Sequence, residues 1–135
     1  MKPLTRRETH PIQNSSDVVL ARQKVRSWAT ELKFTLVDQT KLVTAASELA
    51  RNTLDHGKGG AMIIEIVGNS DKTGIKLVFE DQGPGIPDIQ AALRDGFTTR
   101  GGMGLGLGGS KRLVNDFEIE SEPGKGTRVT VVRWK

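Results

Sequence analysis

The spacing of apolar side chains predicts two consecutive helices near the N-terminus. Apolar residues recur every three or four positions across residues 18–32 and again across residues 42–53, as on one face of an amphipathic helix. Ser15, Ser16 and Asp17 offer caps for a first helix over residues 16–33, and residues 34–37 form a connector. Asp38 can cap the second helix, which we expect to end at Gly57 as a left-handed C-terminal residue.

Short runs rich in β-branched residues predict strands in the remainder. Residues 6–12 read as a first strand, and Pro11 argues for an edge position. Residues 61–67 and 75–80 predict one hairpin, and residues 117–122 and 127–134 predict another. We expect a short helix over residues 88–94 and a further helix around residues 110–115. The order β-α-α-β-β-α-β-β favours an α+β sandwich with a mixed, mostly antiparallel sheet and helices on one face.

Composition narrows the class of protein. A length of 135 residues suits a single domain over residues 1–135, and 36% hydrophobic with 27% charged residues is typical of a soluble globule. With no cysteine, disulfides and zinc–cysteine sites are excluded. No signal peptide or bilayer-spanning run is evident, so we expect a cytoplasmic protein that binds no membrane. The net charge is +4, but basic residues are scattered and aromatic residues make up only 4%, so we expect no nucleic-acid partner.

Glu48 and Asn52 form the first candidate for chemistry. Because they are four residues apart on a helix, their side chains project from the same face. The Asn52 amide oxygen is a hard neutral ligand suited to Mg²⁺, and Glu48 could orient or deprotonate a nucleophile near a terminal phosphate. Such a pair is also common on solvated helix surfaces, so it indicates a site only together with other motifs.

Asp81 is the second candidate, because it follows an apolar strand and precedes Gly83 and Gly85. Glycine allows the backbone to approach a ligand closely, and a carboxylate beside bare backbone can accept a hydrogen bond from an exocyclic amine such as adenine N6. The ordinary alternative is a strand-ending turn, for which Asp, Gly and Pro are the usual residues.

Residues 101–109 contain glycine at six of nine positions and lead into an apparent helix, whose free N–H groups would suit an anion. Gly104, Gly106 and Gly109 satisfy the spacing of a dinucleotide fingerprint, but no apolar strand precedes them, so we reject that interpretation. The P-loop pattern also fails, because Ser110 and Lys111 follow the glycines in the wrong order. A plain linker conflicts with the interleaved apolar residues.

Taken together, these segments resemble the N, G1 and G2 boxes of the GHKL ATP-binding superfamily over residues 37–134. Segments 48–52, 81–86, 94–98 and 106–113 are similar to its anti-sigma-factor serine/threonine kinase branch, and particularly to the switch kinases of bacterial stressosomes. The resemblance implies a Bergerat fold, which is a two-layer α/β sandwich, and an ATP-dependent protein kinase that uses Mg²⁺.

The resemblance also assigns roles to positions. Asn52 would hold Mg²⁺ and Glu48 would be the catalytic base. Asp81 would read adenine, with Thr127 assisting through water. The other expected nucleotide-binding residues are Gly83, Gly85 and Ile86 around the base and Thr99, Arg100, Gly102, Met103, Gly104, Leu105, Gly106, Leu107, Gly108 and Lys111 along the lid and phosphates. Either Arg100 or Lys111 would approach the terminal phosphates.

The partners implied are a STAS-domain antagonist as substrate and a PP2C-type phosphatase or a sigma factor as alternative partner. We expect a monomer or a weak homodimer. A rival interpretation is an anti-sigma factor that sequesters its partner in a nucleotide-dependent way without obligatory phosphotransfer. A detached histidine-kinase catalytic domain is a third, but only about fifteen residues precede the first helix, too few for a dimerisation hairpin.

Overall fold

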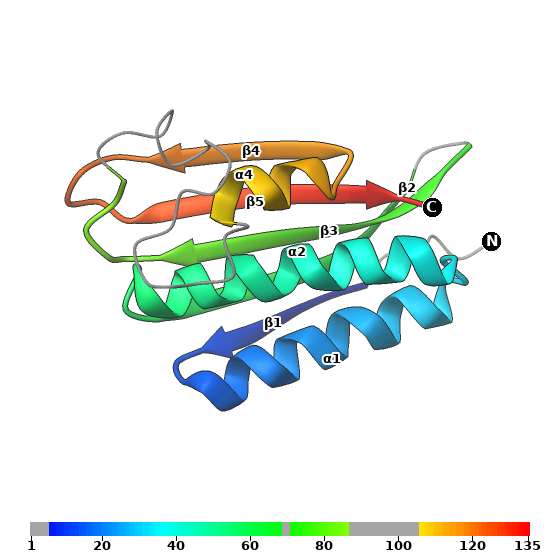
Figure 1. Cartoon of the computed structure of the whole chain (residues 1–135), viewed down its shortest axis with the longest axis horizontal. Helices are drawn as coiled ribbons and strands as arrows, with labels where there is room; N and C mark the ends of the chain where they lie inside the picture. The colour runs from blue at the N-terminus through cyan, green and yellow to red at the C-terminus, as the bar shows by residue number, and fades with distance from the viewer. Residues whose placement is uncertain (1–5, 69–70, 87–105) are drawn as a thin grey trace.

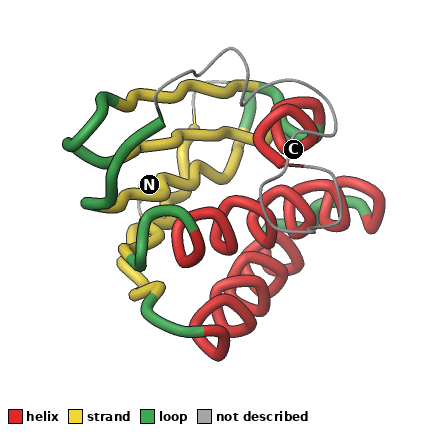
Figure 2. Tube along the Cα trace, turned by 60° about the vertical axis from the view of Figure 1, so that its left-hand side comes forward, coloured by secondary structure: helices red, strands yellow, loops and turns green. Residues whose placement is uncertain are grey.

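A five-stranded sheet covered on one face by helices forms the architecture. The computed structural model describes residues 6–68, 71–86 and 106–135. In chain order the elements are β1 (Arg6–Ile12), α1 (Ser15–Glu31), α2 (Leu36–Asp55), β2 (Gly60–Gly68), β3 (Thr73–Asp81), α4 (Gly106–Arg112), β4 (Asp116–Ser121) and β5 (Thr127–Trp134). The strand order is β1-β2-β3-β5-β4 (Figure 1). Figure 2 shows the helices in one layer and the strands in the other, which confirms the predicted α+β class.

All four strand pairings are antiparallel, so the sheet has none of the parallel pairs that a mixed sheet would contain among the strands described. Both predicted hairpins are present, as β2 with β3 and β4 with β5. β1 lies at one edge, as Pro11 indicated. The predicted helix over residues 88–94 lies outside the described residues. The helix expected around residues 110–115 begins earlier, at Gly106, and ends at Arg112.

Both long helices begin at caps other than those predicted. Asn14 caps α1 by accepting a hydrogen bond from the Asp17 N–H at 2.9 Å, and Thr35 caps α2 by accepting from the Asp38 N–H at 3.1 Å. Asp17 and Asp38 instead lie in the first turns, where a carboxylate is favoured by the positive end of the helix dipole. Because several residues before each helix can act as a cap, the sequence did not identify which one does.

The end of α2 also differs from the prediction. The helix ends at Asp55 with His56 as C-cap, and Gly57 is not left-handed. The left-handed residues after this helix are Lys58, with φ 60, and Gly59, with φ 101. Gly57 is buried, and the reason for a glycine there lies in the site described below.

The core lies between the helices and the inner face of the sheet. Alternate residues of the central strand β3 point inward, and Ile75, Leu77 and Phe79 are at most 2% exposed. The facing helices contribute Val25 and Trp28 from α1, together with Leu42, Ala46 and Leu49 from α2. The helical stripes predicted from the sequence therefore form the core.

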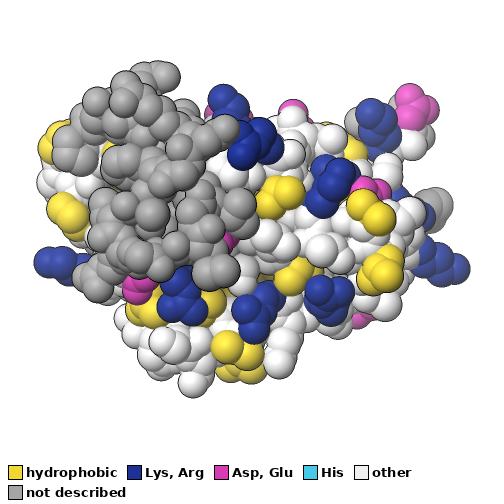
Figure 3. Space-filling view, in the orientation of Figure 1, with side chains coloured by type: hydrophobic (Ala, Val, Ile, Leu, Met, Phe, Trp, Pro, Cys, Tyr) yellow, Lys and Arg dark blue, Asp and Glu magenta, His cyan; other side chains and the backbone are white. Residues whose placement is uncertain are grey.

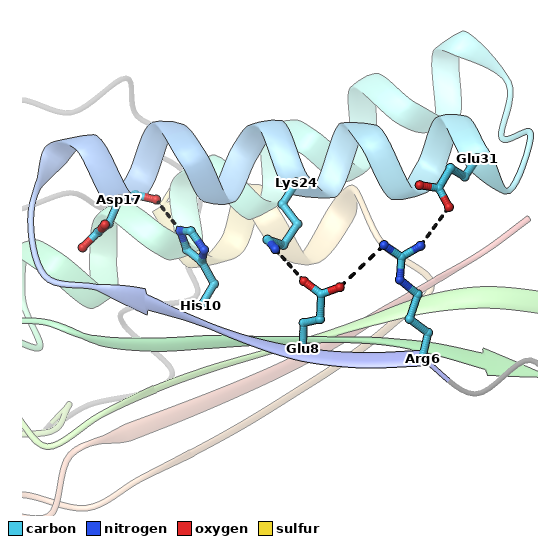
Figure 4. A network of polar contacts seen from close by, with 6 residues as sticks. All are labelled: Arg6, Glu8, His10, Asp17, Lys24 and Glu31. Atoms are coloured by element: carbon cyan, nitrogen blue, oxygen red, sulfur yellow. Dashed lines mark hydrogen bonds and ion pairs between the residues drawn. The ribbon is translucent and has the colours of Figure 1, made fainter.

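Polar contacts hold the edge strand β1 against α1 (Figure 4). Lys24 Nζ lies 2.6 Å from Glu8 Oε1, and Arg6 NH1 lies 2.8 Å from Glu31 Oε2. The Arg6 guanidinium also lies 4.1 Å from the centroid of the Trp28 ring. Because these side chains are partly solvated, each ion pair contributes little stability, and their main effect is to fix the position of the strand.

Arg133 connects α2 with the C-terminal part of the fold. Its NH2 group lies 2.5 Å from Asp38 Oδ1 in the first turn of α2, and its NH1 group donates to the Leu113 carbonyl at 3.2 Å. The guanidinium beside Asp38 holds the pKa of that carboxyl below its usual value. This contact fixes the start of α2 relative to β5 and the residues after α4.

Candidate functional site

Asp81 is the last residue of β3. It lies at the inward-facing position that follows Ile75, Leu77 and Phe79, so a carboxylate stands where the alternation would place another apolar side chain. Its Oδ1 accepts hydrogen bonds from the Gly83 N–H at 3.0 Å and the Thr127 N–H at 3.2 Å. Within the described residues, its Oδ2 has no hydrogen-bond partner. Burial raises the pKa of Asp81, an effect that the two N–H donors and the charge of His56 partly offset. One carboxylate oxygen is therefore fixed by the fold and the other is available to a ligand.

Gly57 leaves the space that the Asp81 side chain occupies. A Cβ atom at Gly57 would lie 2.3 Å from Asp81 Cγ and 2.4 Å from Oδ2, well inside the carbon–carbon contact distance. A Cβ atom at Gly83 would lie 2.7 Å from the Gly57 Cα. The backbones after α2 and after β3 therefore touch directly, and the carboxylate is held against glycine backbone.

The turn after β3 packs on the β4–β5 hairpin. Gly85 has φ +80, a left-handed conformation that favours glycine, and the Ile86 N–H donates to Ser121 Oγ at 2.7 Å. Ser121 Oγ lies 2.8 Å from Thr127 Oγ1. Since Asp81 pairs with Thr127 and Thr127 pairs with Ser121 across the strands, the three side chains form a polar row at one end of the inner face.

Glu48 and Asn52 lie on the last turns of α2, on the same face and half-exposed. No hydrogen bond or ion pair engages either side chain within the described part of the chain. The Asn52 carbonyl accepts from the His56 N–H at 2.9 Å and the Gly57 N–H at 3.2 Å, so the turn that bears Asn52 also positions Gly57 against Asp81. The backbone after α2 therefore links the turn that bears Asn52 to Asp81, while the assignment of Glu48, Asn52 and Asp81 to one site stays a prediction.

The glycine segment is described only in part. Gly106, Leu107, Gly108 and Lys111 belong to α4, in which Leu107 is 7% exposed and packs in the core while Lys111 is exposed. The predicted nucleotide contacts Thr99, Arg100, Gly102, Met103, Gly104 and Leu105 lie outside the described residues. The choice between Arg100 and Lys111 as phosphate contact therefore stays a prediction.

Two site residues were missed by sequence reasoning. Gly57 was assigned to a helix end, but it provides the surface on which Asp81 lies. Ser121 was placed in a strand without a role, but its hydroxyl joins the Ile86 turn to Thr127. Each role depends on a contact between residues far apart in the sequence, 24 positions from Gly57 to Asp81 and 35 from Ile86 to Ser121. Nothing in the local pattern around either residue signals such a contact.

The arrangement fits an adenine nucleotide with a magnesium ion. The Oδ2 atom of the half-buried Asp81 has no partner in the part of the chain that the structure describes and can accept a hydrogen bond from an exocyclic amine. Among the described residues there is no cluster of three or more His, Cys, Asp or Glu side chains that could hold a metal. The single amide of Asn52 is sufficient only for a cation that takes its other ligands from phosphate and water, as Mg²⁺ usually does.

In the described residues no helix is long and apolar enough to cross a membrane.

The fold and this site define an ATPase domain of the GHKL class. The chain belongs to the family of histidine kinase-, DNA gyrase B- and HSP90-like ATPases, which matches residues 37–135. This confirms the resemblance identified in the sequence and supports the predicted use of ATP.

Two relatives define its position within that family. The chain is 47% identical over 123 residues to the serine/threonine-protein kinase RsbT of Bacillus subtilis (strain 168), across 91% of this chain and 92% of that protein. It is 32% identical over 133 residues to the anti-sigma F factor of Thermoanaerobacter sp. (strain X514), across 94% and 92% of the two chains. The predicted branch of the superfamily is thereby confirmed.

Solved structures support the fold independently. The structure of the RsbU and RsbW domains of Rv1364c from Mycobacterium tuberculosis matches with a TM-score of 0.65 at 18% identity, covering 99% of this chain and 33% of that one. The mycobacterial sensor histidine kinase MprB matches with a TM-score of 0.56 at 18% identity, covering 96% and 97%. At this identity the two structures bear on the fold alone.

Proposed function

We propose that the protein is an ATP-dependent serine/threonine kinase that acts as a partner switch. The observation that carries the proposal is the 47% identity to a protein kinase, in a chain whose α2 carries Glu48 and Asn52 on one face and whose Asp81 Oδ2 has no hydrogen-bond partner among the described residues. The substrate is a STAS-domain antagonist, and the alternative partner of the released kinase is a PP2C-type phosphatase.

Asp81 selects the base. Its Oδ2 accepts a hydrogen bond from the exocyclic amine of adenine, while Oδ1 stays fixed by Gly83 and Thr127. Guanine carries a carbonyl oxygen at the corresponding position, and an oxygen facing a carboxylate would leave two acceptors unpaired. Thr127 lies beside Asp81 and can hold a bridging water to the base.

Glu48 and Asn52 act at the other end of the nucleotide. Asn52 contributes an amide oxygen to Mg²⁺, which when bound neutralises charge on the phosphates. The oxygen of the substrate hydroxyl forms a bond to the γ-phosphorus of ATP while Glu48 accepts the hydroxyl proton. The bond between that phosphorus and the oxygen of the leaving ADP breaks. Lys111, or Arg100, contributes positive charge near the phosphates that react.

Phosphotransfer tests the proposal directly. The purified protein with Mg²⁺ and γ-³²P-ATP should label a Ser or Thr of a STAS-domain protein from the same host. Glu48→Gln should reduce transfer at least about 100-fold, because a general base typically contributes 10²–10⁴-fold, and should leave ATP binding by calorimetry unchanged. Glu65→Gln, a half-exposed carboxylate on the outer face of β2, is the matched control. Full transfer by Glu48→Gln, or no labelled STAS protein with the wild type, contradicts the proposal.

Base recognition has its own test. Asp81→Asn keeps an oxygen for the Gly83 and Thr127 donors but replaces Oδ2 with an NH₂ group that cannot accept from adenine. A lost hydrogen bond to a charged group costs about 1.5–3 kcal/mol, so ATP affinity should fall about 10–100-fold. Glu80→Gln changes the neighbouring carboxylate on the opposite face of β3 and should bind ATP as the wild type does. Equal affinities for Asp81→Asn and the wild type would remove Asp81 from the site.

The 32% identity to an anti-sigma F factor favours a second candidate, which is nucleotide-dependent sequestration of a partner such as a sigma factor. The two candidates differ in their need for Glu48. If Glu48→Gln loses transfer and the regulatory output in cells changes with it, the kinase function is the relevant one. If the regulatory output is unchanged and the variant still captures its partner, sequestration is the relevant function.

A further inference from the structure

The exposed large apolar side chains of the described residues all lie on α1 and α2. They are Val19 (39% exposed), Leu20 (49%), Leu36 (71%) and Val37 (62%). Leu36 and Val37 are the most exposed and are consecutive in the first turn of α2, so they form a patch rather than two isolated positions. Contiguous exposed apolar surface is typical of sites where another molecule binds.

One face of α2 connects this patch to Glu48. Val37, Lys41, Thr44 and Glu48 are separated by four, three and four residues, which places them in one row along the helix. The row lies opposite the buried positions of α2, such as Leu42, Ala46 and Leu49. Its eleven-residue length corresponds to about 16 Å at 1.5 Å per residue. A small protein domain seated over Val37 and Lys41 therefore reaches Glu48.

The fully exposed ionisable side chains on and between α1 and α2 are mostly basic. Within residues 15–55, five exposed ionisable side chains are basic, namely Arg22, Arg26, Lys33, Lys41 and Arg51, and the one exposed acid is Glu31. Glu31 is already paired with Arg6, while no ion pair engages the five basic side chains within the described part of the chain. Figure 3 shows basic and hydrophobic side chains interspersed across the face over α1 and α2. A partner complementary to this surface carries acidic groups around an apolar contact.

We propose that Leu36, Val37, Lys41 and Thr44, here called the docking face, bind the protein substrate and guide its phosphoacceptor hydroxyl to Glu48. The partner presents acidic side chains around an apolar residue. This inference rests on the proposed kinase function and adds to it the place where the substrate binds and the chemistry that it presents.

A folded protein fits the docking face better than a polyanion does. Glu48 ends the row and has no ion pair among the described residues, so a dense array of phosphates on nucleic acid or lipid would meet its carboxylate. Aliphatic side chains paired with a few cations match a mixed apolar and acidic protein surface.

Two substitutions test the docking face, each with a matched control. Leu36→Glu introduces a negative charge at an exposed position in the first turn of α2, where the helix dipole favours acidic side chains. Lys41→Glu reverses the charge at an exposed position. Leu20→Glu is the control for the first, because Leu20 lies four residues before Lys24 and so on the β1 side of α1. Arg7→Glu is the control for the second, because Arg7 is exposed on the face of the sheet opposite the helices.

The readout is steady-state kinetics with the STAS-domain protein that the wild type labels. Leu36→Glu and Lys41→Glu should each raise KM for that protein about tenfold or more, as expected for a loss at a contact that dominates binding. We expect kcat within about twofold of the wild type, KM for ATP unchanged, and both controls at wild-type values. Added salt should raise KM for the wild type and have less effect on Lys41→Glu.

The outcomes separate this inference from the proposed function. If the wild type labels no STAS-domain protein, the proposed function fails and the docking face fails with it. If the wild type is active and both variants keep the wild-type KM, or the controls are equally impaired, the docking face alone is wrong. Binding of the wild type to phosphatidylglycerol vesicles that Leu36→Glu abolishes would assign the face to a membrane and overturn the proposal.

Crosslinking gives a second measurement that does not depend on rates. With p-benzoylphenylalanine at position 37, light should join the kinase to the same STAS-domain protein. The photoreactive residue at position 20 should give no such product. A crosslink from position 20 and none from position 37 would place the substrate elsewhere.

Discussion

Gly57→Ala should displace the carboxylate that we assign to base recognition. The added Cβ atom would stand 2.3 Å from Asp81 Cγ, and carbon atoms in contact are normally about 3.5–4.0 Å apart, so the two groups must separate by more than about 1 Å. That shift breaks the hydrogen bonds of 3.0 and 3.2 Å from Gly83 and Thr127 to Asp81. Overpacking costs about 1–3 kcal/mol and a lost hydrogen bond to a charged group about 1.5–3 kcal/mol. Because the two effects overlap, we expect a total loss of about 2–4 kcal/mol.

Thermal unfolding and calorimetry measure this effect. A loss of that size lowers Tm by about 10 °C in a domain of this length, and displacement of Asp81 should weaken ATP binding at least about tenfold. Gly68→Ala is the matched control, because a Cβ atom there would have its nearest neighbour at 3.4 Å, at the far end of β2. The control should stay within about 0.5 kcal/mol of the wild type. A Gly57→Ala protein with wild-type Tm and wild-type ATP affinity would refute the reasoning.

Three further predictions concern charge and hydrogen bonding. Because burial raises the pKa of Asp81, the folded nucleotide-free protein binds a proton that the unfolded chain releases near pH 3.9, so its free energy of unfolding falls as pH rises through the raised pKa. Asp81→Asn should therefore be more stable than the wild type in urea at pH 7, with a gap that narrows toward pH 4; a gap independent of pH would contradict this origin. Arg133→Met should lower the free energy of unfolding by about 1.5–3 kcal/mol and return the pKa of Asp38 toward its ordinary value, which a urea titration and carboxyl NMR would measure; an unchanged urea midpoint would show that the contact is not stabilising. Ser121→Ala removes the acceptor for the Ile86 N–H and should cost about 1–2 kcal/mol in thermal unfolding, and equal Tm values would argue against that role.

The elements of the fold could be predicted from local pattern because helical and alternating spacing record which side faces the core. Leu42, Ala46 and Leu49 are buried on α2 as their spacing indicated, and Pro11 lies in an edge strand. Cap positions could not be assigned in the same way. Asn14 is followed by three further residues that can cap a helix, and cap propensities do not separate Asn, Ser and Asp.

Sequence reasoning proposed the site residues whose side chains have carboxylate or amide groups, and it missed those whose role depends on a tertiary contact. Glu48, Asn52 and Asp81 could be proposed from the sequence because together with the glycine segment they match the motifs of a known superfamily, although each motif alone is also common on surfaces or in turns. Gly57 could not, since its importance depends on Asp81 arriving next to it when the sheet forms. The exposure of Leu36 and Val37 was equally hidden, because an apolar residue in a sequence normally indicates the interior.

The desolvated carboxylate of Asp81 has a practical consequence for engineering. If Asp81→Asn is the more stable protein, a screen that ranks variants by heat resistance alone would reward that substitution and enrich proteins with weakened nucleotide recognition. Selection of hardier versions should therefore monitor nucleotide retention in parallel, and a sequence library built for robustness should keep position 81 constant.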